Sequence, residues 1–321
     1  MINSSEPLVS IITPCYNGER FLGDFFDSIL NQNYRNIELF FINDGSTDKT
    51  EEIAIRYKEK FVDNNMQFHY IKQENGGQAV AINQALPLIQ GKYFMWPDAD
   101  DILLPNNISK KIEVLEENTD IGLVMAQAVI IKESGEKTDK ILKRDDCSKK
   151  DNLFLDFIFE RNIIFCPGIF MCRTEMFRNC VPNMQIYAGR GGQNWQMLLP
   201  VLYQYKYAYI DEVLYGYRVV SNSHSRQMLD AQEYINRYKM HQEILIHTIE
   251  SIDMNEGRKR RLIDKVKVKY YRLNMILYYK AGERKKSHRE FYKIIKAKHL
   301  GIQDLKNIIK IICIRFHIGD F

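Results

Sequence analysis

The sequence predicts an α/β fold, in which a mostly parallel, Rossmann-type sheet is covered by helices and followed by a helical C-terminal extension. Apolar, β-branched segments alternate with segments of helical periodicity along the first 130 residues of the 321-residue chain. Such alternation is typical of parallel sheets with helices on their faces. From about Gln227 onward the pattern is almost entirely helical. A separate helical region is therefore expected to complete the chain.

Strands and helices are expected to alternate in the first part of the chain. The strands are predicted at residues 8–14, 36–44, 67–72, 92–96 and 121–131. The helices are predicted at residues 20–32, 46–61, 76–89 and 105–118. Asp48 and Glu51 have the spacing of a capping box at the start of the second helix. Pro105 suits the first turn of the fourth helix, because that position needs no backbone N–H.

The pattern after residue 130 is less regular. Residues 133–152 are polar and weakly patterned, which indicates a long surface connection of the kind that often borders a functional site. A strand is expected within 167–173, and residues 194–205 are expected to form a helix that Pro200 bends. Residues 207–219 alternate aromatic and other side chains, which predicts a pair of strands.

The composition indicates a soluble globular protein of the cytosol. Hydrophobic residues make up 45% of the chain, and the longest apolar run, "IIFCPGIFMC", is too short to cross a membrane. The N-terminus shows neither a basic region nor a long apolar core, so we expect no secretion signal. The six cysteines include no CxxC pair. We therefore expect reduced, structural thiols and a cytoplasmic location.

The charge is unevenly distributed along the chain. The formal net charge is +4, but residues 256–321 contain 19 Lys and Arg against 6 Asp and Glu. This segment therefore carries +13, which leaves −9 for the remaining residues. A basic tail on an acidic body favours an anionic partner such as a membrane surface, although a solvated helical face is the commoner explanation. Nucleic acid is not expected as a partner, because the acidic body offers no supporting basic patch.

Polar groups follow four successive predicted strands. The residues concerned are Pro14, Tyr16 and Asn17, then Asn43, Asp44, Gly45 and Ser46, then Asn75, Gly76, Gly77 and Gln78, and finally Asp98, Ala99, Asp100 and Asp101. Because ligands bind beyond the carboxyl ends of parallel strands, these groups are expected to form one site. The chain contains neither the GxGxxG motif of dinucleotide-binding proteins nor the phosphate-binding P-loop motif.

The residue types at this edge suit a nucleoside diphosphate and a divalent cation. Tyr16 can stack on a base, and the Asp44 carboxylate can accept a hydrogen bond from a base N–H. Asp98 and Asp100 are two residues apart, so in an extended segment both point to one side. One can bind a ribose hydroxyl and the other the cation, for which oxygen ligands favour Mg²⁺ or Mn²⁺. Taken singly, each motif is also compatible with an ordinary turn, with Asp101 capping the following helix.

The ordered motifs resemble glycosyltransferase family 2, which has the GT-A fold. The resemblance is carried by "VSIITPCYNGERFLGDFFDSILNQNYRNIELFFINDGSTDKT", "ENGGQAVAINQAL" and "GKYFMWPDADDIL". It is strong over residues 7–130 and looser over residues 150–225. It implies that residues 1–130 form the nucleotide-sugar-binding half of the domain and residues 131–226 the acceptor-binding half. Residues 227–321 then form the basic helical C-terminal region.

The resemblance also implies roles for individual residues. It implies that Pro14, Tyr16, Asn17 and Asp44 surround the nucleotide, usually UDP, and that Asn75, Gly77 and Gln78 lie near the ribose or the diphosphate. Asp98, Ala99 and Asp100 correspond to the DxD motif, with Asp100 as the more direct ligand of Mn²⁺ or Mg²⁺. The stretch "YGYRVVSNSHS" implies a contact to the diphosphate or the metal from Arg218, Ser223 or His224. For His224, an imidazole in a surface loop is an equal alternative.

The sequence departs from the family at the expected catalytic base. Relatives usually carry a Glu-Asp pair before a Trp-containing helix, and the Asp acts as the base. Here Gln193 and Asn194 precede Trp195, and amides do not take up a proton near neutral pH. Three explanations are open. Another carboxylate, such as Asp145, Asp146 or Glu160, can act as the base, or the acceptor is a phosphate that is already ionised and needs no base. In the third, the protein binds a sugar nucleotide without turning it over. On the first view, Gln193 and Asn194 bind the substrates and Trp195 packs beneath them, unless Trp195 is simply a core residue.

The expected function is that of a metal-dependent, inverting glycosyltransferase acting on a cell-surface glycan or a lipid-linked acceptor. The alternative is a catalytically silent sugar-nucleotide-binding or scaffold protein of a glycan-assembly complex. The C-terminal segment has an apolar stripe formed by Leu305, Ile308, Ile309, Ile312 and Cys313. Lys306 and Lys310 lie off this stripe, as in an interfacial helix. We therefore expect peripheral contact with the inner face of the plasma membrane, while packing on the protein's own domain is the more common arrangement.

Overall fold

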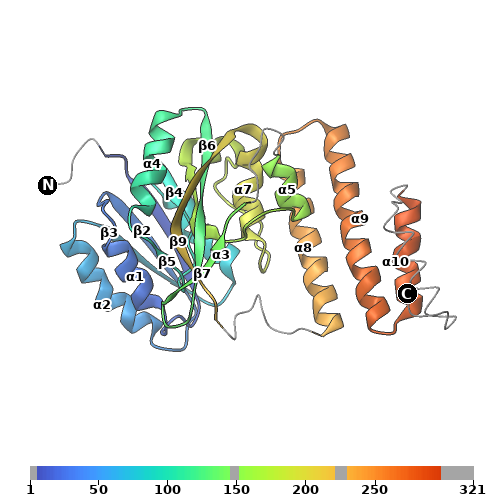
Figure 1. Ribbon diagram of the computed structural model, residues 1–321, viewed down its shortest axis with the longest axis horizontal. Helices are drawn as coiled ribbons and strands as arrows, with labels where there is room; N and C mark the ends of the chain where they lie inside the picture. Colours follow the sequence, from blue (N-terminus) through green and yellow to red (C-terminus); the bar gives the residue numbers. More distant parts are fainter. Residues whose placement is uncertain (1–5, 145–151, 221–229, 298–321) are drawn as a thin grey trace. The chain divides into compact units, whose positions relative to one another are not determined.

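The computed structural model describes residues 6–144, 152–220 and 230–297. The chain divides into two compact units, Met1–Arg226 and Gln227–Phe321 (Figure 1). The first unit holds a mixed sheet with the strand order β3-β2-β1-β4-β8-β6-β9-β5, and β7 pairs with β6 outside this order. The second unit is helical in the part that the structure describes. The predicted α/β class with a helical extension is therefore confirmed.

The first part of the sheet is parallel. Its strands are β1 (Val9–Cys15), β2 (Ile37–Asp44), β3 (Gln67–Gln73) and β4 (Tyr93–Met95). The helices that connect them are α1 (Leu22–Leu30), α2 (Thr50–Asp63) and α3 (Gln78–Ala85), which continues into the short 3₁₀ helix η1 (Leu86–Leu88). Because such crossovers are right-handed, α1 and α2 cover one face of the sheet and α3 covers the other. The carboxyl ends of β1 to β4 consequently meet at one edge.

The second part of the sheet adds antiparallel strands. It contains β5 (Ile102–Leu103), α4 (Asn107–Glu117), β6 (Ile121–Ile131), β7 (Lys137–Leu142), α5 (Leu153–Phe159), η2 (Pro167–Ile169), β8 (Phe170–Arg173), α6 (Thr174–Cys180), α7 (Gln193–Gln204) and β9 (Lys206–Arg218). β8 is antiparallel to β4 and β6, β5 to β9, and β7 to β6, whereas β9 runs parallel to β6. The antiparallel β8 thus joins the parallel strands to the rest of the sheet.

The structure corrects two predictions about strands. Residues 207–219 do not form a strand pair, because β9 is one long strand. It pairs with β6 along its length, and the register of the pairing shifts at several points. The polar segment 133–152 is not only a surface connection, since Lys137–Leu142 forms β7 and returns along β6 after a turn at Gly135. The side chains of β7 are mostly exposed, so the strand lacks the apolar pattern by which a buried strand is predicted.

Two predictions about helix starts also need correction. α2 begins at Thr50, and Asp48 accepts hydrogen bonds from the backbone nitrogens of Thr50 and Glu19 instead of forming a capping box with Glu51. Pro105 precedes the N-cap residue Asn106 and lies outside the first turn of α4. The predicted helix around Pro200 is confirmed as α7, which runs from Gln193 to Gln204, and the bend at Pro200 stays a prediction. The two corrected helix starts depend on contacts between separate loops, which local spacing does not contain.

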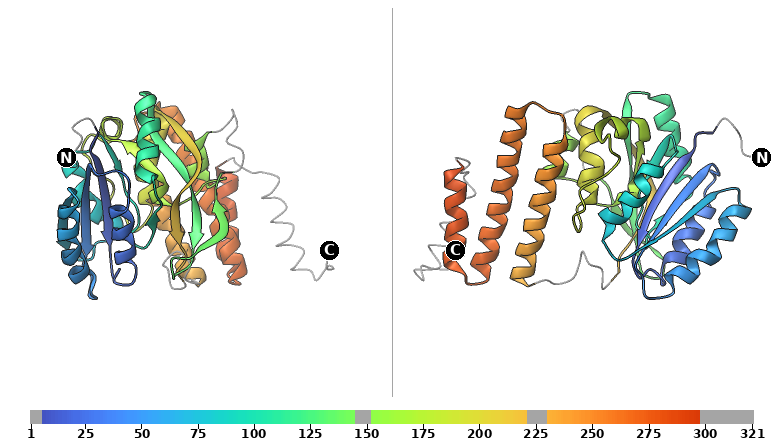
Figure 2. Two further views of the ribbon diagram at one scale, coloured as in Figure 1. Left: turned by 60° about the vertical axis from the view of Figure 1, so that its left-hand side comes forward. Right: turned by 180° about the vertical axis from the view of Figure 1, so that it is seen from behind.

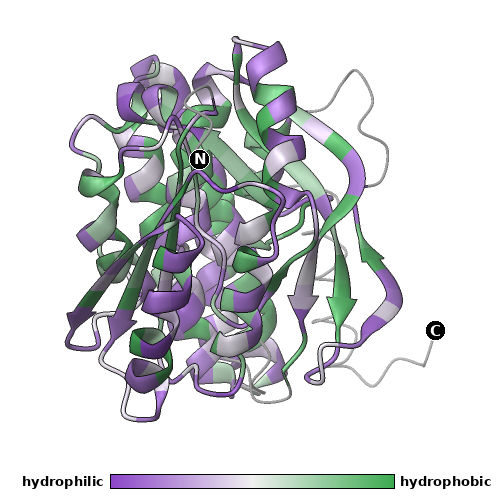
Figure 3. Ribbon diagram, turned by 90° about the vertical axis from the view of Figure 1, so that its left-hand side faces the viewer, coloured by the Kyte–Doolittle hydropathy of each residue, from purple (hydrophilic) through white to green (hydrophobic). Residues whose placement is uncertain are grey.

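The core of the first unit lies on both faces of the sheet. Phe26 of α1 is fully buried, and its ring contacts those of Phe41, Tyr57 and Phe68. On the other face, the ring of Phe40 stacks on His69. In Figure 3 the strands contain hydrophobic stretches, whereas the helices alternate between hydrophobic and hydrophilic positions. This packing fixes the strand ends from which the functional side chains project.

The second unit contains three helices in the part that the structure describes. They are α8 (Ala231–Ser251), α9 (Glu256–Lys280) and α10 (Arg284–Lys296), which lie side by side in chain order (Figure 2). Val268, Met275 and Ile294 form a buried cluster between α9 and α10. Among the described residues, no helix is long and apolar enough to span a bilayer. The stripe predicted at residues 305–313 lies outside the described residues.

Candidate functional site

The loop after β3 is fastened to the end of β2 by Asp44. The two oxygens of this buried carboxylate accept hydrogen bonds from Gly76 N, at 2.8 Å, and from Gly77 N, at 2.9 Å. Oδ1 also accepts from the Gln73 side chain, and the backbone oxygen of Asp44 accepts from the Asn75 amide. The loop is therefore held rigidly where α3 begins. In this structure the Asp44 carboxylate binds protein N–H groups, and its contact to a base stays a prediction.

Two glycines allow the loop to approach this closely. Gly45 has a φ of +75°, and a Cβ at this position would lie 2.7 Å from the backbone nitrogen of Asn75. Gly77 has a φ of +86° and is the N-cap residue of α3. A side chain at either position would be strained, because L residues other than glycine rarely adopt these angles. The first turn of α3 thus presents its backbone N–H groups at the edge of the sheet, where they favour an anion.

The turn after β1 lies beside the turn after β2. Asn17 has a φ of +52°, its backbone N–H donates to Ser46 Oγ at 2.9 Å, and its Oδ1 accepts from Thr47 N at 2.9 Å. Pro14 is buried within β1, whereas the side chain of Tyr16 is 48% exposed. Tyr16 is therefore available to a ligand, while Asn17 already ties the two turns together.

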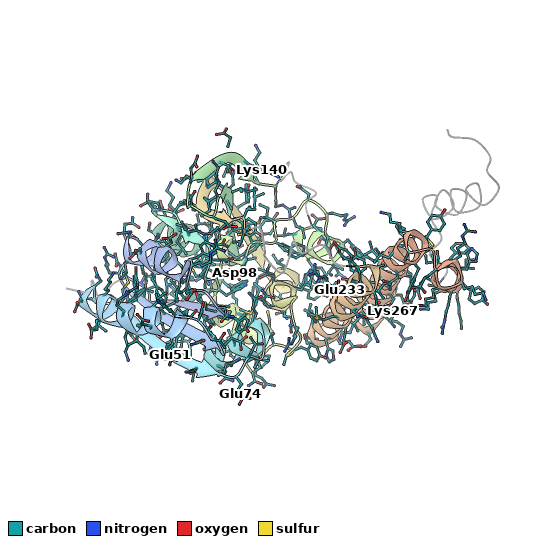
Figure 4. All side chains as sticks on the ribbon, turned by 90° about the horizontal axis from the view of Figure 1, so that it is seen from below. Glu51, Glu74, Asp98, Lys140, Glu233 and Lys267 are labelled. Carbon is teal, nitrogen blue, oxygen red and sulfur yellow. The ribbon has the colours of Figure 1, made fainter. Side chains whose placement is uncertain are left out.

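Three carboxylates converge at the end of β4. Oxygen atoms of Asp98, Asp100 and Asp101 all lie within 4.8 Å of one another, and Asp98 is labelled among the elements of the first unit in Figure 4. Burial raises the pKa of Asp98 to about 7, the nearby Asp100 adds to this rise, and a hydrogen bond from Gln78 opposes it. Burial likewise raises the pKa values of Asp100 and Asp101. The cluster therefore holds unfavourable negative charge that a cation would relieve.

Arg218, at the end of β9, holds the backbone of this acidic segment. Its backbone N–H donates to Asp101 Oδ1 and its Nε to the backbone oxygen of Asp100, both at 2.7 Å. The remaining guanidinium nitrogens donate to the backbone oxygen of Glu133 and to Asp24. The side chain of Arg218 is fully buried. Arg218 therefore holds the acidic segment in place. The Asp101 carboxylate accepts a hydrogen bond from the Arg218 backbone and does not cap α4.

The amide pair at the start of α7 is hydrogen-bonded to both the acidic segment and α3. Gln78 Nε2 donates to Asp98 Oδ1 at 3.1 Å, and Gln193 Nε2 donates to Gln78 Oε1. Trp96 Nε1 donates to Asn194 Oδ1 at 2.9 Å. We call these five residues, Trp96, Gln78, Asp98, Gln193 and Asn194, the amide relay. The relay is not apparent in local sequence patterns, because two of its contacts join residues 98 and 115 positions apart, although the unusual Gln-Asn pair is visible.

Trp195 and Glu160 lie in contrasting surroundings. The side chain of Trp195 is 3% exposed, and its Nε1 donates to the backbone oxygen of Phe157 at 3.0 Å. Trp195 therefore packs between α5 and α7 as a core residue. Glu160 is exposed at the end of α5. The predicted Asp145, Asp146, Ser223 and His224 lie outside the residues that the structure describes.

The acidic cluster fits a hard divalent cation. Its ligand atoms are carboxylate oxygens, the donors that Mg²⁺ and Mn²⁺ prefer. The carboxylates are crowded enough to raise one another's pKa values, and a bound cation would reverse this effect. Asp98 and Asp100 are partly accessible, whereas Asp101 is 1% exposed and engaged by Arg218. Asp98 and Asp100 are therefore the residues best placed to bind a cation.

Sequence comparisons identify related glycosyltransferases. The profile of "Glycosyl transferase family 2" matches residues 10–181. An uncharacterized glycosyltransferase of Rickettsia typhi is 42% identical over 121 residues, which cover 37% of this chain and 36% of the relative. The chain thus matches only about a third of that relative's length. TuaG of Bacillus subtilis, a putative teichuronic acid biosynthesis glycosyltransferase, is 30% identical over 219 residues, which cover 68% of this chain and 81% of TuaG.

Solved structures share the fold. S. aureus TarS in complex with UDP-GlcNAc aligns with a TM-score of 0.65 at 15% identity, over 90% of this chain and 81% of TarS. The mannosyltransferase PcManGT of Pyrobaculum calidifontis, in complex with GDP-Man and Mn²⁺, aligns with a TM-score of 0.56 at 16% identity, over 96% of this chain and 80% of PcManGT. The expected GT-A fold is confirmed. With a profile match over more than half of its length, the chain belongs to glycosyltransferase family 2.

Proposed function

We propose that this protein is a metal-dependent, inverting glycosyltransferase that uses a nucleotide-sugar donor. The observation that carries the proposal is the cluster of Asp98, Asp100 and Asp101 at the end of β4, next to the uncovered first turn of α3. The cluster suits a divalent cation and the helix start suits a phosphate. The two structural neighbours were crystallised with UDP-GlcNAc and with GDP-Man and Mn²⁺. These ligands support a nucleoside diphosphate sugar as donor, with a UDP-sugar as the first choice.

In the proposed mechanism the protein stabilises the departing nucleoside diphosphate. Asp98 and Asp100 would hold Mn²⁺ or Mg²⁺, which would supply positive charge for the diphosphate. Gly77 and Gln78 begin α3, so its backbone N–H groups can bind a phosphate oxygen, and Asp44 keeps this loop in place. Exposed Tyr16 covers the base, as the family resemblance implies. Stabilising charge on the leaving group is the largest expected contribution to the rate.

The acceptor is proposed to be a cell-surface glycan or a lipid-linked saccharide. TuaG, which is similar over most of its length, is named for teichuronic acid biosynthesis. In the second unit, α10 exposes Lys285, Arg289 and Lys296 together with Tyr292, whose side chain is 66% exposed. Basic residues around an exposed aromatic ring favour contact with an anionic lipid surface. We therefore propose peripheral contact with the inner face of the plasma membrane as part of this function.

A catalytically silent sugar-nucleotide-binding protein is the second candidate. It is favoured by Gln193 and Asn194, because neither amide can take up the proton of an acceptor hydroxyl. The two candidates agree on donor binding and differ in turnover. A protein of the second kind would bind a nucleotide sugar in a metal-dependent way and release no nucleoside diphosphate.

The test is a donor-cleavage assay with a matched pair of variants. The full-length protein is incubated with Mn²⁺ and a panel that includes UDP-GlcNAc and GDP-Man, and the released nucleoside diphosphate is measured. We expect release by the wild type and a loss of about 1,000-fold or more for Asp100→Asn, because the charge for the leaving group is lost. Asp63→Asn, an exposed carboxylate of α2, is the control and should retain activity. Full activity of Asp100→Asn contradicts the proposal, and metal-dependent binding without release supports the silent alternative.

A further inference from the structure

The amide relay consists of two separate hydrogen-bonded groups, Trp96 with Asn194 and Gln193 with Gln78 and Asp98. Trp96 Nε1 can only donate, so the atom of Asn194 that it contacts must be the amide oxygen. Gln78 Nε2 donates to Asp98, and its oxygen accepts from Gln193. For Asn194 the usual ambiguity between the oxygen and nitrogen of an amide does not arise, because the indole N–H of Trp96 can only donate.

This polarity makes Asn194 a donor toward the site. Its Oδ1 is engaged by Trp96, and Nδ2 forms no hydrogen bond with another described residue, so both its N–H groups remain available. Gln193 is 8% exposed, and its Nε2 is engaged by Gln78. At the position where a base is expected, the protein thus offers hydrogen-bond donors, which bind an acceptor oxygen.

Other carboxylates near the relay are already engaged. Asp44 is bound by the loop of Gly76 and Gly77, Asp101 by the Arg218 backbone, and Asp98 by Gln78. Asp98 and Asp100 also belong to the proposed cation site. The described carboxylates at this edge are therefore assigned to holding the loop, the acidic segment and the cation, and no hydrogen bond joins any of them to Asn194.

Positive charge also borders the start of α7. A Cβ at Gly77 would lie 3.6 Å from Cγ of Arg190, so the stem of Arg190 passes the start of α3. Arg190 is exposed and forms no ion pair with another described residue. Its loop is held by Asn83, which exchanges two hydrogen bonds with the backbone of Ile186, and by Gln196, which does the same with Tyr187. Arg190 thus brings a positively charged side chain to the start of α3, in the loop that leads into α7.

We propose that the acceptor attacks with an oxygen that is already ionised, as in a phosphate or a carboxylate, and that Asn194 binds this oxygen through Nδ2. The proposal rests on the proposed function. An electron pair of the oxyanion forms the bond to the anomeric carbon. The bond between that carbon and the diphosphate oxygen breaks, and its electron pair leaves with the nucleoside diphosphate. No proton has to be removed from the attacking oxygen, so the step needs no base.

The first test compares simple nucleophiles as acceptor probes. The wild-type protein is incubated with Mn²⁺ and the donor that the panel identifies, together with inorganic phosphate, acetate or glycerol at equal concentrations. Release of the nucleoside diphosphate is measured, and products are identified by mass spectrometry. We expect phosphate or acetate to increase release about 10-fold or more, with the glycosyl phosphate or glycosyl acetate as product, and glycerol to have no such effect. The two anions distinguish a phosphate from a carboxylate acceptor.

The second test uses the sign of the effect of Asn194→Asp. An aspartate can still accept from Trp96, so the fold should be retained, but it would repel an anionic acceptor and lacks the donating N–H groups. We expect anion-dependent transfer to fall by about 10- to 100-fold. Asn255→Asp is the control, because Asn255 is an exposed N-cap residue of α9 and aspartate caps equally well.

Three results would overturn the inference. They are faster transfer to glycerol than to either anion, no effect of either anion on donor cleavage, and a gain in transfer for Asn194→Asp. A gain would mean that a base had been restored for a hydroxyl acceptor. An absence of donor cleavage in the wild type under every condition contradicts the proposed function itself, so the two failures are distinguishable.

Discussion

Buried carboxylates lie at both ends of the parallel strands, and the protein treats them in opposite ways. At the amino end, Glu38 is 1% exposed, and its Oε1 accepts hydrogen bonds from Ser10 Oγ and from the backbone nitrogens of Gln90 and Gly91. At the carboxyl end, Asp98, Asp100 and Asp101 crowd together, and Asp98 receives a side-chain hydrogen bond from Gln78. Glu38 is satisfied by the protein, whereas the carboxylates of the acidic cluster keep raised pKa values even with the Arg218 guanidinium nearby.

The contrast separates a structural carboxylate from a functional one. Three donors aimed at one oxygen stabilise the charge of Glu38 and join β1 and β2 to the segment before β4. The raised pKa values in the acidic cluster mean that ionising these carboxyl groups lowers the stability of the folded protein. Destabilising charge of this kind is typical of functional sites, where stability is given up for ligand binding.

The largest expected effect on stability is at Glu38. Glu38→Ala leaves the buried Ser10 hydroxyl without its acceptor and removes the acceptor of Gln90 N, while Gly91 N keeps only Ser10 Oγ, so we expect a loss of roughly 2–4 kcal/mol in the free energy of unfolding. Urea denaturation followed by circular dichroism measures this change. Glu38→Gln is the matched control, because its amide oxygen can still accept, and it should lose only about 1 kcal/mol. Equal losses in the two variants would show that the three donors are not the cause.

The acidic cluster should respond in the opposite direction. The folded-state pKa of Asp98 is raised to about 7, so the folded protein binds its proton more tightly than the unfolded chain does. This contribution to stability is present below the unfolded pKa and is lost as the pH rises through the folded pKa. In metal-free protein above neutral pH, we therefore expect Asp98→Asn to raise the free energy of unfolding, by on the order of 2 kcal/mol.

The pH dependence of this gain provides its control. In acidic solution, below the ordinary pKa of aspartate, the wild-type carboxyl is protonated in both states and the gain should vanish. Thermal denaturation of the wild type and Asp98→Asn, each with a chelator, compares the two conditions. A destabilised Asp98→Asn at neutral pH would mean that the Asp98 carboxylate is satisfied in the same way as Glu38, and the contrast between the two ends of the sheet would fail.

Much of the first half could be predicted from the sequence, because its signals are local. β1, β2 and β4 are rich in contiguous apolar residues, and the polar residues that follow each strand are adjacent in the chain. Since parallel strands bring their carboxyl ends together, the clustering of Asp98 and Asp100 beside Gly77 and Gln78 followed from the order of elements. The oxygen-rich ligand set was likewise visible in the DxD motif.

The remaining features depend on contacts between distant segments. The exposed strand β7 has no apolar alternation, and the length of β9 is set by β6, its partner. The orientation of Asn194 is determined by Trp96, and that of Gln193 by Gln78 and ultimately by Asp98. Arg218 was expected at the diphosphate, but its buried guanidinium clamps the acidic segment. Such roles become apparent only when the hydrogen-bond partners are known.

The central claim is that Asp98 and Asp100 bind a divalent cation together with the diphosphate of the donor. Its most direct test is calorimetric titration of UDP into the protein with and without Mn²⁺, for the wild type and for Asp100→Asn. We predict that Mn²⁺ tightens UDP binding to the wild type by about 10-fold or more, the size of a typical coupling between two bound ligands, and has no such effect in Asp100→Asn. Equal UDP affinity with and without Mn²⁺ in the wild type, or the same tightening in Asp100→Asn, would contradict the account.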